Sequence, residues 1–205
     1  MNTPKQSRSQ QTMNRMLDAA ETLLETKSWQ ELTIQEVVKH ANSSVGAFYG
    51  RFKDKDGLLQ ALDKRYFDIL IGLIESSVNQ PEWQTLNLDE TVYKIADLIV
   101  ALHSGKQGVL RTLILQARLV NDPRFRGREE RLMEHMPQLV DFILKHRSEI
   151  KHDDVSGTIQ FGLLQMFYSA REMLIWPHIS ETLPVPKSQL TVLLAKACIG
   201  FFRCS

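Results

Sequence analysis

The segment from Thr33 to Asp56 constrains the fold most, because it carries signals for two short helices separated by a tight turn. Thr33 followed three residues later by Glu36 is a capping-box pattern, which predicts that a helix begins near Ile34. Apolar residues then recur at helical spacing as far as Ala41. The sequence therefore predicts a first short helix with one buried apolar face.

The helical pattern stops at Asn42, a residue that tolerates left-handed backbone, and at Ser44, a frequent helix cap. It resumes at Val45, Phe48 and Phe52, but this second run is too short to be stable unless it lies on other helices. Two helices joined by a turn of this length form a helix-turn-helix motif. The second helix of that motif enters the major groove of DNA with its N-terminal residues against the base edges.

Three stretches within residues 11–60 extend this pattern, namely LDAAETLLE, LTIQEVVKHA and SSVGAFYGRFKDKDGLL. Together they resemble the N-terminal DNA-binding domain of the tetracycline-repressor (TetR) family of bacterial transcriptional regulators. Four features of the family's domain recur in this chain. They are an alanine pair at Ala19 and Ala20, the threonine that opens the second helix at Thr33, a Gly-x-x-Tyr core from Gly46 to Tyr49, and the lysine that opens the fourth helix at Lys55. The chain departs from the family at Ser28 and Asn42, where glycine is common, so Ser and Asn are expected to keep these turns.

The resemblance implies which side chains meet DNA. The residues expected to face bases are Ser44, Val45, Gly46 and Ala47. The residues expected to contact phosphates are Thr33, Tyr49, Arg51 and Lys55. Phosphate contacts position a protein without reading sequence. Val45 stands at a place that is often polar or basic, which favours apolar contact with a thymine methyl group. Gly46 costs roughly 1 kcal/mol of helix stability relative to alanine, which indicates a packing or contact reason for it.

Beyond residue 56 the apolar pattern is helical with little sign of strands, so the predicted fold class is all-α. A long helix is expected to run out of the DNA-binding domain to about residue 79. Further helices are expected at 89–103, 107–120, 128–150 with an interruption or kink near Pro137, 153–176 and 186–203. The predicted domains are a helix-turn-helix domain over 1–54, ordered from about residue 10, and a helical effector-binding and dimerisation domain over 55–205.

The last two predicted helices are apolar on more than one side, so they need a second surface to cover them. The expected cover is the same pair of helices from a second subunit, and the TetR resemblance implies the same homodimer. The alternative, that both faces belong to an internal core, stays open. The expected interface residues are Phe161, Leu164, Tyr168, Leu190, Leu194, Ala197 and Phe201. A two-fold dimer requires double-stranded DNA with an inverted-repeat operator.

An effector pocket is implied by the resemblance alone. In this family a small molecule in the helical domain moves the connecting helix, so that the two recognition helices no longer fit the DNA. The candidate lining residues are Phe67, Leu70, Ile74, Leu98, Leu102, His103, Leu110, Ile114, Arg118, Phe167 and Arg171. Ordinary core packing explains nearly all of them equally well. A salt bridge, with Glu172 or Asp97 as candidate partners, is the favoured interpretation of both Arg118 and Arg171, and an acidic ligand is the alternative.

Composition and charge restrict the classes of function that this chain can have. With 25 Lys and Arg against 24 Asp and Glu, the chain is nearly neutral, so any basic surface must be local. The polar start MNTPKQSRSQ lacks the apolar core of a signal peptide, and no apolar run is long enough to span a membrane. Cys198 and Cys204 lack metal or redox spacing. These features predict a cytoplasmic protein with reduced thiols.

No nucleophile elbow, phosphate loop, dinucleotide fingerprint or HExxH motif occurs, so no catalytic, cofactor or metal site is predicted. A weak cluster of His146, His152, Asp153 and Asp154 is typical of a helix end and the cap of the next helix. The predicted function is a sequence-specific transcriptional regulator, namely a repressor released from its operator by an unidentified small molecule. The alternative is an architectural or activating helix-turn-helix protein without small-molecule control.

Overall fold

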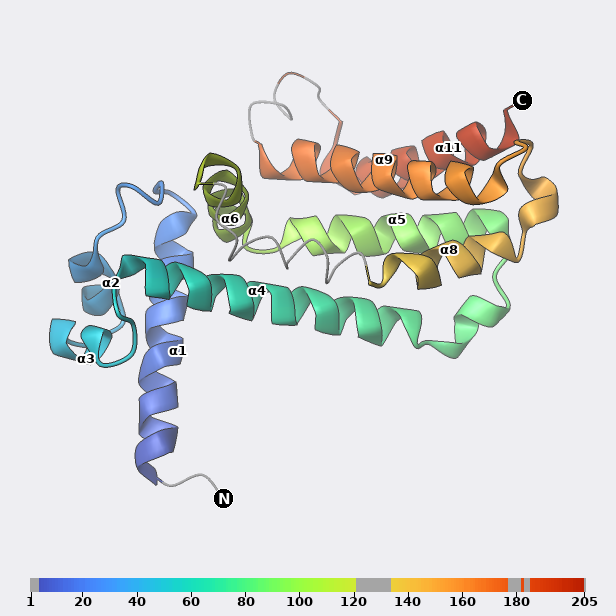
Figure 1. Ribbon diagram of the computed structural model, residues 1–205. Helices are drawn as coiled ribbons and strands as arrows, with labels where there is room; N and C mark the ends of the chain where they lie inside the picture. The colour runs from blue at the N-terminus through green and yellow to red at the C-terminus, as the bar shows by residue number, and fades with distance from the viewer. Residues whose placement is uncertain (1–3, 121–133, 177–181, 183–184, 205) are drawn as a thin grey trace. The chain divides into compact units, whose positions relative to one another are not determined.

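A computed structural model describes residues 4–120, 134–176, 182 and 185–204 (Figure 1). All regular secondary structure in these ranges is helical, which confirms the predicted fold class. None of the helices described there is long and apolar enough to cross a membrane. By its contacts the chain divides into a first unit, Met1–Asp68 with Lys106–Asn121, and a second unit, Ile69–Gly105 with Asp122–Ser205. The functional boundary expected after residue 54 stays a prediction.

The first unit contains the DNA-binding motif. Its helices are α1 (Pro4–Leu24), α2 (Ile34–His40), α3 (Val45–Tyr49), the N-terminal part of α4 (Lys55–Val78) and α6 (Gln107–Val120) (Figure 1). Helix α1 begins at Pro4. Proline suits this position because it lacks a backbone N–H, and the first N–H groups of a helix have no intrahelical partner.

The core of the first unit is built by the apolar faces that the sequence predicts. Met16, Ala20, Val37, Phe48 and Leu62, drawn from α1 to α4, are almost completely buried. The five-residue helix α3 is anchored by Phe48, whose ring lies 5.0 Å from that of Phe52. A helix this short is not stable alone, so its position depends on this buried anchor.

The second unit is a bundle of longer helices. It contains the C-terminal part of α4, α5 (Leu88–Ser104), α8 (Met136–Leu144), α9 (Val155–Ile175), α11 (Lys187–Arg203) and the short 3-10 helices Pro81–Gln84 and Arg147–Glu149. Helix α5 packs against α8, α9 and α11, and α9 packs against α8 and α11 (Figure 1). Fully buried apolar side chains from α5, α8, α9 and α11 fill the centre of this bundle.

Two sequence signals in the second unit have clear structural outcomes. Pro137 lies in the first turn of α8 and does not kink a longer helix there, since its missing N–H would have no intrahelical partner at that place. The residues before 134 in the expected helix 128–150 lie outside the described part of the chain. Trp83 is buried, stacks on Phe142 with ring centroids 4.5 Å apart, and donates its indole N–H to the Ser77 carbonyl at 2.7 Å.

Candidate nucleic-acid interface

The start of α2 is fixed by the predicted capping box. The Thr33 hydroxyl oxygen accepts from the Glu36 backbone N–H at 3.3 Å, and the Glu36 carboxylate accepts from the Thr33 N–H at 3.1 Å. Lys27 also donates to this carboxylate. The Lys27 hydrogen bond, together with those from Thr33, lowers the pKa of Glu36 to about 2. The carboxylate is therefore ionised at neutral pH and caps the helix.

The turn between α2 and α3 uses the residues that the sequence places there. Asn42 has φ of 47°, which confirms the left-handed conformation expected at this position. The Ser43 N–H donates to the Val38 carbonyl at 2.8 Å. The Ser44 hydroxyl oxygen caps α3 by accepting from the Ala47 N–H at 3.1 Å. These local bonds set the direction in which α3 leaves the turn.

The four residues expected to face bases lie at the N-terminal end of α3. Ser44, Val45 and Gly46 are exposed, while Ala47 is half-buried. Val45 is 40% exposed, although it is apolar. A Cβ atom added at Gly46 would meet no atom of the described structure within 4 Å. The packing of the described residues therefore gives no reason for glycine at this position.

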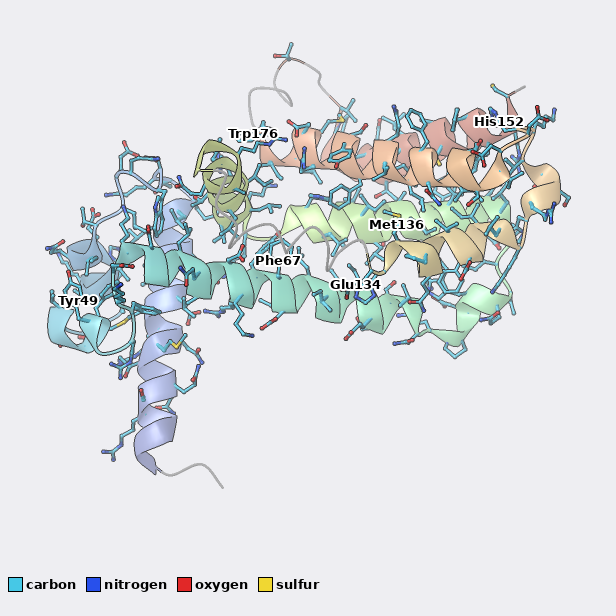
Figure 2. The ribbon with its side chains drawn as sticks, in the orientation of Figure 1. Tyr49, Phe67, Glu134, Met136, His152 and Trp176 are labelled. Atoms are coloured by element: carbon cyan, nitrogen blue, oxygen red, sulfur yellow. The ribbon has the colours of Figure 1, made fainter. Side chains whose placement is uncertain are left out.

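The residues expected to contact phosphate fall into two groups. Tyr49 is 55% exposed on α3 (Figure 2) and Thr33 is exposed at the start of α2. Arg51 instead donates to the carbonyls of Ala47 at 2.7 Å and Ser9 at 3.2 Å, so it joins the end of α3 to α1. These assignments to DNA stay predictions.

Lys55 also has a partner within the protein. Its ammonium donates to the Trp29 carbonyl and lies 4.6 Å from the centre of the Trp29 ring. Partial burial lowers the pKa of Lys55. An ammonium group has three N–H donors, so the bond to Trp29 leaves others for a phosphate. No sequence signal pairs Lys55 with Trp29, because the two residues are distant in the chain.

The second unit contains an apolar cavity of about 40 Å³ between α4, α5, α8 and α9. Four of the predicted pocket residues line it, namely Ile74, Leu98, Leu102 and Phe167. The lining residues that the sequence did not single out are Ile99, His135, Met136, Leu139 and Leu163. Figure 2 shows Met136 at the start of α8, on the side of α5. Helical periodicity marks these positions as apolar or helical but does not distinguish a cavity wall from ordinary core.

The other predicted pocket residues lie elsewhere. Leu70 is buried in the second unit but does not line the cavity. Phe67, Leu110, Ile114 and Arg118 belong to the first unit, where Arg118 is exposed.

His103 and Arg171 have different partners. His103 is buried, its Nδ1 lies 2.7 Å from the Ile99 carbonyl oxygen, and its ring meets that of Phe167 edge-on at 4.7 Å. Burial lowers the pKa of His103 to about 4. Arg171 donates to the Glu172 carboxylate at 3.0 Å and lies 4.6 Å from the Tyr168 ring centre. The salt bridge expected for Arg171 is confirmed.

The residues expected at a dimer interface divide between surface and core. Phe161, Tyr168 and Ala197 are exposed, and Leu164 and Phe201 are half-buried. Leu190 and Leu194 are already buried within the second unit. A groove of about 150 Å³ between α9 and α11 includes Phe161, Leu194, Ala197 and Phe201 in its walls. The surface available to a partner is therefore the exposed set together with this groove.

The cluster near the start of α9 has structural roles. Asp154 caps α9 by accepting from the Gly157 N–H at 2.9 Å, which confirms that this cluster includes the cap of the next helix. The Nε2 atom of His152 lies 2.8 Å from the Phe201 carbonyl oxygen. His146 lies with its Nδ1 atom 3.9 Å from the Glu149 carboxylate.

Residues 16–62 match the model of a family described as bacterial regulatory proteins, tetR family. An uncharacterized HTH-type transcriptional regulator, YwcC from Bacillus subtilis (strain 168), is 29% identical over 104 residues. That match spans about half of either protein, 49% of this chain and 46% of the relative.

The fold is similar to those of solved regulators. A bacterial regulatory protein in the tetR family from Rhodococcus RHA1 aligns over 95% of this chain and 98% of its own, with a TM-score of 0.71 and 14% identity. The fatty acid degradation regulator FadR from Bacillus halodurans aligns over 100% of both chains, with a TM-score of 0.68 and 13% identity. At these identities the likeness concerns the fold.

Proposed function

We propose that this chain is a member of the tetR family of bacterial regulatory proteins and acts as a dimeric repressor that leaves an inverted-repeat operator when a small molecule binds. It acts on DNA in the bacterial cytoplasm. The observation that carries the proposal is the exposed N-terminal end of α3, where Gly46 has no packing partner in the described structure.

The exposed end of α3 suits a recognition surface. Glycine at position 46 lets the backbone approach a groove closely, and Val45 offers an apolar contact that matches a thymine methyl group. Tyr49 presents a hydroxyl group that suits a phosphate oxygen, whereas the Thr33 hydroxyl already donates to the Glu36 carboxylate at 2.9 Å and would have to exchange that bond for one to phosphate. The capping bonds at Ser44 and Thr33 are local, so the surface is already formed in the free protein.

Dimerisation is supported by apolar surface on α9 and α11. Phe161 is 52% exposed and Tyr168 is 47% exposed, and Leu193 on α11 is also exposed. Large apolar side chains gathered on one surface usually mark an interaction site. A two-fold contact there would pair two α3 helices, and an inverted repeat is the DNA that such a pair matches.

Effector control is supported by the cavity in the second unit. A space of about 40 Å³ holds only a few waters, so a larger ligand must widen it and must bind a different conformation better than this one. Ile74 on α4 forms part of the wall, and α4 begins at Lys55 beside the DNA-binding motif. Differential affinity for two conformations is what couples a ligand to DNA release.

Selection of random duplex DNA by the purified protein, with sequencing of the bound pool at near-physiological salt, tests this function. An enriched inverted repeat is expected, and Val45 variants should enrich a different half-site. A Tyr49→Phe variant should enrich the same repeat with weaker binding, because phosphate contacts carry no base information. A pool without any enriched motif would contradict the recognition surface assigned to α3.

The operator then separates the two regulatory alternatives. A repressor of the proposed kind loses operator affinity with a specific compound, which a fluorescence-based screen of small molecules on the labelled operator would detect. An architectural protein responds chiefly to salt, because counterion release dominates non-specific binding. A strong salt response without a preferred sequence would favour the architectural alternative.

A further inference from the structure

A groove of about 310 Å³ lies within the first unit, between α6 and residues 24–30 at and after the end of α1. This volume is at the lower end of the range for small-molecule sites, about 300 to 1,000 Å³. The wall residues that matter here are Glu25, Trp29, Arg111, Thr112, Leu115 and Gln116. The groove does not share a residue with the cavity in the second unit.

The two walls are held together at the start of α6. A Cβ atom on Gly108 would lie 2.1 Å from the Leu24 carbonyl oxygen, so only glycine fits at this contact. The Gly108 N–H lies 3.3 Å from each carboxylate oxygen of Glu25. Nearby, Lys106 forms an ion pair with the buried Glu21. The groove therefore has a defined shape.

Two opposite charges, the exposed Glu25 and the half-buried Arg111, line the groove without an ion pair to any described residue. Within the described residues, Glu25 forms no ion pair and Arg111 forms neither an ion pair nor a hydrogen bond. Arg111 follows Gly108 by about one helical turn, a rise of roughly 5 Å. Lys27 is already paired with Glu36. The groove thus offers one carboxylate and one guanidinium that are not neutralised by each other.

Two further polar side chains lie on the same face of α6. Thr112 is 6% exposed and Gln116 is 9% exposed, and both line the groove. The described part of the structure gives neither side chain a hydrogen-bond partner. Among the described residues, the enclosed and unpaired polar side-chain atoms are Arg65 Nη1 and Thr91 Oγ1, so the polar atoms of Thr112 and Gln116 are open to the groove. A polar ligand there can hydrogen-bond to both in place of water.

Apolar groups complete the walls. Trp29 is one of the wall residues, and Leu115 is 39% exposed although it is a large aliphatic side chain. A ligand that fits must therefore carry a negative group for Arg111, a positive group for Glu25 and an apolar portion. Guanidinium binds carboxylate with two parallel hydrogen bonds.

We infer that this groove binds a free α-amino acid with an apolar side chain, with its carboxylate on Arg111, its ammonium on Glu25 and its side chain against Trp29 and Leu115. A simple anion would leave Glu25 without a cation, and a simple amine would leave Arg111 without an anion. Binding at this place bridges α1 and α6, and it does not depend on the proposed operator or on the effector cavity.

Isothermal titration calorimetry on the full-length protein without DNA tests the site, with L-leucine and L-phenylalanine as probes. Saturable binding of at least one is expected. Arg111→Gln and Glu25→Gln should each weaken it at least tenfold, while Lys64→Gln, which removes an exposed cation elsewhere in the same unit, should not change it. Thr112→Val keeps the side-chain shape and should weaken binding several-fold without lowering the unfolding temperature.

Blocked analogues test the assignment of the two charges. N-acetyl-leucine lacks the ammonium and leucinamide lacks the carboxylate, so each is expected to bind at least tenfold more weakly than leucine. Absence of binding by both amino acids, equal binding of a blocked analogue, or unchanged binding in Arg111→Gln would overturn the inference. DNA selection is a separate measurement, so failure here leaves the proposed function standing.

Discussion

The first unit carries its proposed DNA-binding surface on short helices, whereas the second unit places its cavity and its apolar surface on long ones. In the first unit, α3 has five residues and is positioned by caps, a left-handed Asn42 and the buried Phe48. In the second unit, α5 and α9 have 17 and 21 residues and are positioned by packing between helices. Local signals thus determine the first surface, and long-range packing determines the second.

The largest expected effect is a loss of stability in the second unit that leaves the DNA sequence preference of the first unit unchanged. Trp83→Ala removes a buried ring that stacks on Phe142 in the second unit, and truncating a buried Trp costs about 3 to 5 kcal/mol. Chemical denaturation should show this loss, while the half-site enriched from random DNA stays the same. A changed base preference would contradict the contrast between the two units, because it would mean that residues of the second unit help to determine which DNA sequence is recognised.

His103 makes the stability of the second unit depend on pH in a way that is not expected for the first unit. Its pKa of about 4 in the folded protein lies below the ordinary value of 6.5, because burial disfavours the charged ring. The unfolded chain therefore binds the proton first. Stability is fully present above about pH 6.5 and falls as pH decreases toward 4, by on the order of 3 kcal/mol.

A His103→Gln variant sharpens this test, because it cannot titrate in that window. Urea denaturation at several pH values should give a flatter dependence of unfolding free energy between pH 4 and 6.5 than in the wild type. An equally steep curve in the variant would mean that another group is responsible. His40 is an exposed histidine of the first unit, so His40→Gln serves as the matched control and should leave the slope unchanged.

Val45→Asn should change which base the first unit prefers. An Asn side chain can form two hydrogen bonds with adenine, whereas valine offers an apolar contact, so the change in preference is expected to be about 1 to 3 kcal/mol. Affinities for operator duplexes that differ at one base pair measure it. Leu73→Asn is the control, since this residue is 37% exposed on the part of α4 that belongs to the second unit. Equal shifts in both variants would argue against α3 as the recognition surface.

The capping boxes of α2 and α5 can each be removed by one substitution, with a smaller expected effect on stability. Thr33→Ala removes the cap of α2 and Asn87→Ala removes that of α5, and each should lower stability by about 1 kcal/mol. Only Thr33→Ala is expected to weaken DNA binding as well, because α2 holds the turn that leads into α3. Filter binding on the selected operator, alongside thermal melts, distinguishes the two. If Asn87→Ala lost as much DNA affinity as Thr33→Ala, the two units would not differ in their effect on DNA binding.

The smallest effect on stability is expected at glycine. Gly46→Ala and Gly72→Ala both replace a helical glycine whose added Cβ would meet no described atom within 4 Å beyond its own helix backbone, so each should stabilise the protein by roughly 0.5 to 1 kcal/mol. Only Gly46→Ala should weaken operator binding, because its methyl group would stand between α3 and the groove. A Gly46→Ala protein with unaltered affinity would mean that the α3 backbone does not approach DNA closely.

The sequence by itself determined the features that depend on neighbouring residues. The Thr33 to Glu36 spacing predicted the start of α2, and the Asn42 position predicted the left-handed turn, because caps and turns are formed within a few residues. Helical periodicity predicted the long helices and the all-α class. Most of their boundaries fall within a few residues of the observed ones.

Only the tertiary structure decided which helical faces meet. It showed Lys55 on Trp29, Leu190 inside the core, and a cavity wall that includes Met136 and Leu163. It also brought Arg111 and Glu25 to one groove through a contact at Gly108 that excludes any side chain. These pairings join residues far apart in the chain, and periodicity records that a position is apolar without recording its partner.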